Sequence, residues 1–137
     1  MNSAKIEFSS CSENEAFARV TAAAFVAPLD PTVEELSDIK TAVSEAVTNA
    51  IIHGYEDNSG IVLMELSISG RLLTIEITDF GRGIADIKKA MTPMYTSKPC
   101  LERNGMGFTV MESFMDSLSV KSSPGEGTSV YMTKRIL

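Results

Sequence analysis

The chain has 137 residues, enough for one domain spanning residues 1–137 and too few for two. Hydrophobic residues make up 44% of it and charged residues 22%, a composition that excludes global disorder. The net charge of −6 argues against whole-chain attraction to nucleic acid or to an anionic membrane. No apolar run approaches the ~20 residues of a transmembrane helix. With no signal-peptide layout and two cysteines outside any CxxC motif, we expect reduced thiols in a cytoplasmic protein.

The N-terminal part of the chain predicts a strand and a helix. Apolar and polar residues alternate over Lys5–Phe8, which indicates a short strand. Ser12 and Glu15 have the spacing of a capping box, in which each side chain bonds the backbone N–H of the other residue. We therefore expect a helix that opens at this box and stops before Pro28.

A longer helix follows. Thr32 and Glu35 again have capping-box spacing, and Gly54 is a typical residue at which a helix ends. We expect the helix to run from this cap to about His53 and to end at Gly54. Its apolar stripe consists of Leu36, Ile39, Val43, Ala46, Val47 and Ala50.

The hydrophobic period then changes to two. Ile61–Ile68 and Leu72–Thr78 are rich in β-branched residues and predict two strands joined by a tight turn at Ser69–Arg71. The stretch Asp79–Gly107 is dense in Gly, Pro, Lys and Asn. We expect a loop there, with a short helix around Asp86–Ala90.

The last part of the chain predicts one helix and two strands. Phe108–Met115 has helical spacing, and Leu118–Lys121 and Ser129–Lys134 read as strands around a turn at Ser123–Gly127. Helices gathered against a meandering sheet predict an α/β fold. We expect a two-layer α/β sandwich with its helices on one face of a mixed, mostly antiparallel sheet.

The long helix carries the first candidate site. Glu45 and Asn49 are four residues apart, so their side chains lie on one face, one turn apart and roughly opposite the apolar stripe. A carboxylate and a carboxamide offer oxygen ligands for Mg²⁺, or a base beside a ligand. From this pair alone, a solvated helix face is the favoured interpretation.

The second candidate follows a predicted strand. Asp79 at the end of that strand can accept a hydrogen bond from an exocyclic amine, and Gly81 and Gly83 allow the backbone to turn tightly against a flat ligand. The further acidic residues of an EF-hand loop are missing. An ordinary Asp/Gly turn without a ligand remains the alternative.

The third candidate precedes the last helix. Gly105, Met106, Gly107 and Phe108 lead into it, and free N–H groups at the start of a helix favour phosphate. The run lacks the G-K-[ST] ending of a P-loop. A glycine turn with no ligand is the alternative.

The order of these three motifs resembles the nucleotide-binding boxes of the GHKL ATPase/kinase superfamily, which includes gyrases and histidine kinases. The run Gly125–Thr128 resembles its fourth motif. Two longer runs, residues 45–55 and 102–116, are similar to the anti-sigma F family of spore-forming bacteria, which are serine kinases of this superfamily. The resemblance covers nearly the whole chain and implies a Bergerat-type fold with ATP between the helices and a mobile lid.

The resemblance also implies roles for single residues. Asn49 would coordinate the Mg²⁺ that bridges the ATP phosphates, and Glu45 would be the general base. Asp79 would bind the adenine amine above Gly81 and Gly83. Thr128 would help to close the adenine pocket through water. The phosphates would receive N–H groups from Gly105, Met106, Gly107 and Phe108.

A triphosphate needs more than a helix N-terminus, which contributes only ~1 kcal/mol when exposed. Arg103, just before the glycines, is the candidate for the terminal phosphate, and Lys98 is a second one. Both could instead be solvated charges of the lid, Lys98 more readily than Arg103. The lid itself would span residues 86–104, a long polar segment with Pro93 and Pro99.

In the family, the kinase forms a homodimer, binds the sporulation sigma F factor, and phosphorylates a serine of an anti-anti-sigma factor. Glu15 and Arg19 match family positions that contact sigma; an intrahelical ion pair worth ~0.3–0.5 kcal/mol is the alternative. Two other functions compete: a non-catalytic module gated by ATP or ADP, and a fragment of an ATPase that uses water. Glu45 beside Asn49 favours catalysis over the first, and the lack of further domains disfavours the second.

Overall fold

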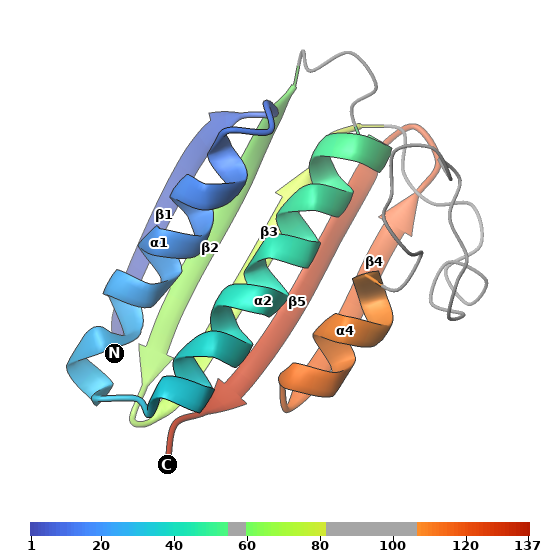
Figure 1. Cartoon of the computed structure of the whole chain (residues 1–137). Coiled ribbons are helices and arrows are strands. Elements are labelled where there is room, and N and C mark those ends of the chain that lie inside the picture. Colours follow the sequence, from blue (N-terminus) through green and yellow to red (C-terminus); the bar gives the residue numbers. More distant parts are fainter. Residues whose placement is uncertain (55–59, 82–106) are drawn as a thin grey trace.

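The chain folds into two layers, with its helices on one face of a five-stranded sheet (Figure 1). The computed structural model describes residues 1–54, 60–81 and 107–137. The helical elements are α1 (Asn14–Val26), the 3₁₀ turn η1 (Ala27–Leu29), α2 (Val33–Asn49), the π-helical turn η2 (Ala50–Gly54) and α4 (Gly107–Phe114). The strands are β1 (Asn2–Ser9), β2 (Ile61–Ser69), β3 (Leu72–Asp79), β4 (Ser117–Ser123) and β5 (Gly127–Arg135).

The strand order is β1-β2-β3-β5-β4, and every pair of neighbours in it is antiparallel. The two-layer α/β sandwich is therefore confirmed, and the described strands form a purely antiparallel sheet, not a mixed one. The reason is that β5 returns between β3 and β4 and runs opposite to both. Asp79 at the end of β3 thereby lies directly opposite Thr128 near the start of β5.

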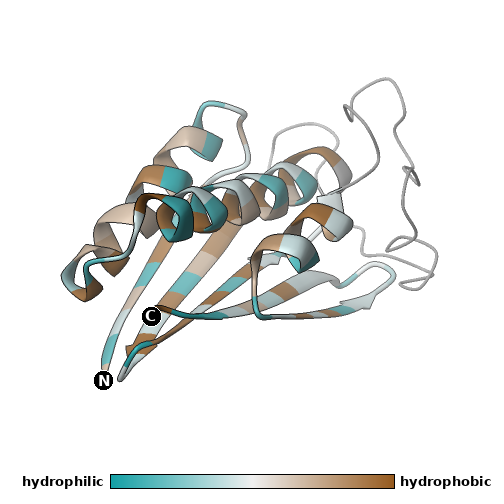
Figure 2. Cartoon of the chain, turned by 60° about the horizontal axis from the view of Figure 1, so that its bottom comes forward, coloured by the Kyte–Doolittle hydropathy of each residue, from teal (hydrophilic) through white to brown (hydrophobic). Residues whose placement is uncertain are grey.

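The core lies between the sheet and the helices. Alternate residues of β2 and β3 are buried beneath the helices, as the period of two predicts. Figure 2 shows the same alternation as brown and paler bands along the strands. Burying one such aliphatic side chain contributes ~1.5–3 kcal/mol. The largest fully buried side chains are Ile39, Met64, Leu66, Leu73, Ile75, Ile77, Met111, Met132 and Ile136.

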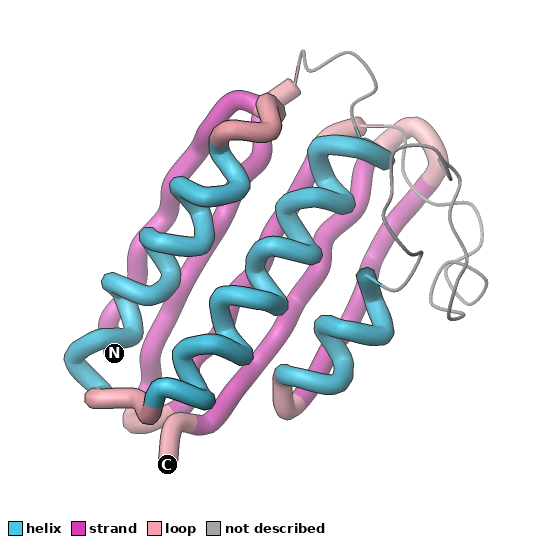
Figure 3. Tube along the Cα trace, in the orientation of Figure 1, coloured by secondary structure: helices cyan, strands magenta, loops and turns pink. Residues whose placement is uncertain are grey.

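The three described α-helices cover different parts of the sheet. α1 lies over β1 and β2, α2 runs along the middle, and α4 lies over β4 (Figure 3). Five of the six residues in the predicted apolar stripe of α2 are buried, and Leu36 packs against the core from its edge. The stripe therefore sets the face of α2 that meets the sheet.

The two predicted capping boxes have opposite outcomes. At α2 the box is complete: the Thr32 hydroxyl accepts from Glu35 N–H at 3.0 Å, and Thr32 N–H donates to the Glu35 carboxylate at 2.9 Å. At α1 the prediction is wrong, because the helix begins at Asn14 without a side-chain cap. The Glu15 carboxylate accepts from Arg19 one turn further on, and this ion pair takes the place of a bond back to Ser12.

The other predicted elements that fall on described residues agree with the structure apart from their bounds. β1, β4 and β5 are longer than the alternation indicated, since the ladders continue beyond the apolar residues. α1 ends before Pro28, as expected. α2 ends at Asn49, and the chain then continues to Gly54 as one π-helical turn, in which Ala50 N–H faces two carbonyls, those of Ala46 and Val47.

One end of the sandwich is held together by side chains. We call it the fastened end: the β2–β3 turn, the start of α2 and the last two residues of the chain. Arg71 donates to the carbonyls of Leu29 at 2.7 Å, Ile136 at 2.8 Å and Leu137 at 3.2 Å. Leu137 N–H donates to the Glu35 carboxylate at 2.9 Å. These bonds tie the sheet to the start of the helix that carries Glu45 and Asn49.

Candidate functional site

The opposite end of the sandwich brings several predicted site residues together. Figure 1 shows the C-terminal ends of α2 and β3, the start of β5 and the beginning of α4 on this side of the molecule. The π turn η2 packs against β3 and β5, and α4 packs against α2. We call this region the open end, and it contains Asn49, Asp79, Gly107 and Thr128.

Asp79 is the buried acid of the open end. Its residue is only 5% exposed, and its carboxylate accepts from Gly81 N–H at 3.0 Å. Burial raises the pKa of Asp79 above its ordinary value, and the N–H groups of Gly81 and Thr128 offset this in part. A charge at this depth is costly unless partners surround it. The carboxylate is therefore well suited to accept a hydrogen bond from an N–H or O–H group of a ligand.

Gly127 holds β5 against the end of β3. Its φ is +99°, and a Cβ built on it would lie 2.1 Å from the Asp79 carbonyl oxygen and 2.7 Å from Phe80 Cα. No side chain fits into that space. Sequence reasoning named Gly127 only as part of the fourth motif and missed this requirement. The contact depends on the pairing of β3 with β5, for which the sequence carries no local signal.

Thr128 lies beside Asp79 and is also linked to β4. The Thr128 hydroxyl is 2.8 Å from the hydroxyl of Ser122. The Ser122 hydroxyl donates to the Gly127 carbonyl at 2.9 Å. The resemblance predicts that Thr128 helps to close the adenine pocket, and the strand register puts it directly opposite Asp79. Ser122 was missed, since a lone serine in a strand carries no pattern.

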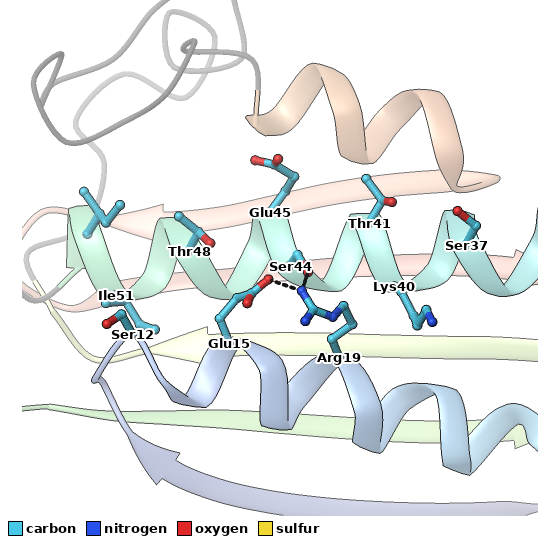
Figure 4. Close-up of a pocket in the computed structure, with 11 residues that line it drawn as sticks. Ser12, Glu15, Arg19, Ser37, Lys40, Thr41, Ser44, Glu45, Thr48 and Ile51 are labelled. Carbon is cyan, nitrogen blue, oxygen red and sulfur yellow. Dashed lines mark hydrogen bonds and ion pairs between the residues drawn. The ribbon is translucent and has the colours of Figure 1, made fainter.

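Glu45 and Asn49 lie one turn apart in the last half of α2, and both are half-buried. Glu45 lines an open groove of about 700 Å³ on the outer side of the helix layer. Figure 4 shows Glu45 on the side of α2 that faces α4, while Ser44 points toward α1. Glu45 therefore has access to a ligand or partner that approaches between α2 and α4.

Glu15 and Arg19 form the other side of the same groove. Arg19 Nη1 lies 2.8 Å from the Glu15 carboxylate and 3.3 Å from the Ser44 hydroxyl (Figure 4). The side chain of Glu15 is 25% exposed and that of Arg19 is 38% exposed. The intrahelical ion pair is therefore present, and the pair also remains accessible from outside.

Of the remaining predicted site residues, the structure describes those from Gly107 onward, at the start of α4. Gly107 and Phe108 begin that helix and are buried, so that their backbone is what they can offer a ligand. Residues 86–104, the expected lid with its short helix at Asp86–Ala90, lie outside the described residues. The predicted site residues that also lie there are Gly83, Lys98, Arg103, Gly105 and Met106.

A metal at the open end would need few protein ligands. The described residues contain no group of three acidic, His or Cys side chains that could hold an ion. Mg²⁺ is commonly bound by one or two protein oxygens together with substrate phosphates and water. Asn49 with a nucleotide fits that pattern.

None of the helices in the described part is long and apolar enough to cross a membrane.

Comparison with known proteins identifies the class. Residues 8–134 match the family model of the histidine kinase-like ATPase domain. A solved structure of the RsbU and RsbW domains of a Mycobacterium tuberculosis protein has the same fold, with a TM-score of 0.72 at 17% identity. The match covers 99% of this chain and 33% of that one.

Relatives of known name narrow the class further. The chain is 64% identical over 133 residues to the anti-sigma F factor of Clostridium kluyveri, a match that covers 97% of this chain and 94% of the relative. It is 59% identical over 134 residues to the anti-sigma F factor of Clostridium acetobutylicum, covering 98% and 94%. The chain belongs to the anti-sigma F family of histidine kinase-like ATPase domains.

Proposed function

We propose that this protein is an ATP-dependent serine kinase and anti-sigma factor of the cytoplasm. It binds sigma F and keeps it from RNA polymerase, and it phosphorylates a serine of an anti-anti-sigma factor, which inactivates that antagonist. One observation supports the nucleotide part of this proposal. Asp79 is a buried acid at the end of a strand. The backbone of Gly127 packs so closely against it that residue 127 has no room for a side chain. The family of the chain carries the sigma part.

The open end supplies the nucleotide site in this proposal. Asp79 accepts the adenine amine, and Gly81 lets the chain turn beneath the base. Asn49 would hold Mg²⁺ together with the nucleotide, and the backbone N–H groups of Gly107 and Phe108 would donate to the phosphates. By family resemblance, Gly83, Lys98, Arg103, Gly105 and Met106 complete the site. Bound ATP supplies the phosphoryl group, and Mg²⁺ neutralises its charge.

Glu45 performs the proton transfer. Glu45 is a half-buried carboxylate one turn from Asn49. In this proposal, an incoming serine meets the phosphates beside it. Its carboxylate takes the proton of the serine hydroxyl while the serine oxygen bonds to the terminal phosphorus and the bond to ADP breaks. A positioned base of this kind contributes ~10²–10⁴-fold to the rate.

Glu15 and Arg19 form the proposed contact with sigma F. The pair is accessible on the outer face of the helix layer, and a chain of net charge −6 suits a basic partner surface. We also propose that the chain acts as a homodimer. α1 leaves Phe17 and Val20 exposed by 50% and 62%, next to the outermost strand β1, which favours a second copy as the occupant of that edge.

The test of the kinase uses ATP labelled at the terminal phosphate, with and without the anti-anti-sigma factor of the same organism. Label on a serine of that partner supports the proposal. Free labelled phosphate would instead identify a water-using ATPase, and nucleotide binding without transfer a gated binding module. A partner whose serines are replaced by alanine is the matched control and should stay unlabelled.

The sigma contact is tested separately with Arg19→Glu, which should weaken binding of sigma F at least ~10-fold, because it puts two like charges at one contact. Nucleotide affinity should remain that of the unmodified protein. Lys40→Glu, in the same groove but on α2, is the matched control. Equal loss of sigma binding in both variants would contradict a specific role of Arg19, and loss of nucleotide binding would indicate a damaged fold.

A further inference from the structure

Lys134 is a charged residue on the side of the sheet that faces the helices. It follows the buried Val130 and Met132 in the inward-facing set of β5, and its side chain is only 12% exposed. An ammonium group at such a place costs free energy unless partners surround it. Replacing a buried ion pair by apolar side chains of similar volume often leaves stability unchanged or raises it. Packing alone therefore does not explain a lysine at this position.

Two partners hold the Lys134 ammonium group. Its Nζ donates to the Phe114 carbonyl at 2.8 Å and lies 3.5 Å from the Asp38 carboxylate. Phe114 is the last residue of α4, and Asp38 lies in the first half of α2. The last carbonyls of a helix have no partner within it and attract a cation. Lys134 therefore caps α4 and links its C-terminal end to α2.

The chain that follows α4 is attached to the same strand. Asp116 N–H donates to the Thr133 carbonyl at 2.8 Å, and the Asp116 carboxylate accepts from Arg135 N–H at 2.7 Å. These two backbone partners flank Lys134 in the sequence. The C-terminal end of α4 is thus bonded to the sheet through Asp116 and to the neighbouring helix through the Lys134 side chain.

The two helices that Lys134 links both belong to the proposed site. α2 and α4 run antiparallel and pack against each other (Figure 1). In the proposed function, α2 supplies Glu45 and Asn49, and the start of α4 binds the phosphates. Phosphoryl transfer requires the attacking oxygen to be in line with the bond that breaks. A misplacement of about 1 Å can lower a rate ~10²-fold. The rate should therefore depend on how α4 lies relative to α2.

We propose that Lys134 is a positioning residue, which ties the C-terminal end of α4 to α2 and so keeps the phosphate-binding start of α4 in line with Glu45. This inference rests on the proposed kinase function and adds to it a residue outside the motifs. Lys134 is at the other end of α4 from the phosphates, about 10 Å along the helix axis. It acts through the helix and does not itself bind the nucleotide.

The test measures phosphoryl transfer from labelled ATP to the anti-anti-sigma factor by the Lys134→Met variant, with ATP saturating and the partner concentration varied. We expect kcat to fall ~10- to 100-fold, while the KM for the partner stays constant. Calorimetric titration with ADP and Mg²⁺ counts the folded sites, so that kcat is expressed per folded site. Urea unfolding followed by circular dichroism measures stability separately.

Two further variants test the route and the specificity of the effect. Asp38→Ala removes the carboxylate on α2 and should also lower kcat. Combined with Lys134→Met it should lower kcat no further, because both changes break the same link. Lys121→Met removes an exposed lysine of β4 and is the matched control, which should leave kcat unchanged. If Lys134→Met fails to fold, Asp38→Ala alone tests the link.

The outcomes distinguish this inference from the proposed function. If stability falls in Lys134→Met while kcat per folded site is unchanged, Lys134 has a structural role only and the inference is overturned. A rise in the KM for the partner at constant kcat would refute positioning as well, since it would indicate a docking role. If the unmodified protein binds nucleotide but transfers no phosphate, the kinase function itself fails, and the inference with it.

Discussion

The two ends of the sandwich treat their polar groups differently. At the fastened end, Arg71 donates to three carbonyls, and Glu35 accepts from the backbone of Thr32 and Leu137. At the open end, Asp79 is buried on the inner face of the sheet. The first arrangement links three separate parts of the chain and stabilises the fold. The second has a cost, because burial disfavours the charged form of Asp79, and the proposed nucleotide site gives that cost a function.

Two carboxyl groups make this difference measurable. The pKa of Glu35 is lowered, first by the N–H of Leu137 and then by that of Thr32, whereas burial raises the pKa of Asp79. A lowered pKa adds stability that is lost as the pH falls through it. A raised pKa has the opposite effect. The folded protein loses stability as the pH rises from the ordinary pKa of the acid through its raised pKa. At neutral pH, Glu35 at the fastened end therefore stabilises the fold, and Asp79 at the open end destabilises it.

The largest effect is expected from Glu45→Gln. We predict that serine phosphorylation falls ~10²–10⁴-fold, because the base is lost, while nucleotide affinity is retained. Transfer from labelled ATP to the anti-anti-sigma factor measures the rate. Glu34→Gln, an exposed acid in the first turn of the same helix at the fastened end, is the matched control and should leave the rate unchanged. Undiminished transfer by Glu45→Gln would contradict the proposed role of Glu45 as the base.

The next effect concerns Gly127→Ala. The added Cβ meets the Asp79 carbonyl and the backbone has a φ of +99°, so we predict a loss of about 3 kcal/mol in the free energy of unfolding. Urea unfolding followed by circular dichroism measures it. Gly125→Ala is the matched control: its φ is +81°, but a Cβ there meets nothing within 4 Å, and the loss should be only about 1–2 kcal/mol. Equal losses would mean that conformation alone, and not the contact with Asp79, sets the need for glycine.

Local features of the fold could be predicted from the sequence, and the contacts between distant strands could not. Alternation located the strands, and the spacing of Thr32 and Glu35 identified a cap that the structure contains. The same spacing failed at Ser12, because a bond to Arg19 competed for the Glu15 carboxylate. The contacts of Gly127 and Ser122 come from the pairing of β3, β5 and β4, which joins residues far apart in the chain. Motif order indicated Asp79 and Thr128, but their side-by-side register comes only from the structure.

A third prediction, Asp79→Asn, addresses the cost of the buried acid. ADP affinity should fall about 10- to 100-fold, because a hydrogen bond to a charged group is lost. In the absence of nucleotide, the stability of the unmodified protein relative to Asp79→Asn should decrease as the pH rises from 3.8, the ordinary pKa of the acid, through its raised value. Urea unfolding of both proteins between about pH 4 and 8 checks the sign. Parallel stability curves would show that the burial of Asp79 has no cost, and the contrast between the two ends would lose its basis.

The smallest effect belongs to the fastened end. Thr32→Ala removes the hydroxyl that accepts from Glu35 N–H, and the unfolding free energy should fall by ~1 kcal/mol. The bond from the backbone N–H of residue 32 to Glu35 does not depend on the side chain and should persist. Thr41→Ala, in the middle of α2, is the matched control and should not destabilise, since alanine favours a helix interior. ADP affinity should be unchanged in both variants, because the cap lies at the opposite end of α2 from Asn49. A change in ADP affinity with Thr32→Ala alone would show that the cap acts along the helix on the open end, and that the two ends are not independent.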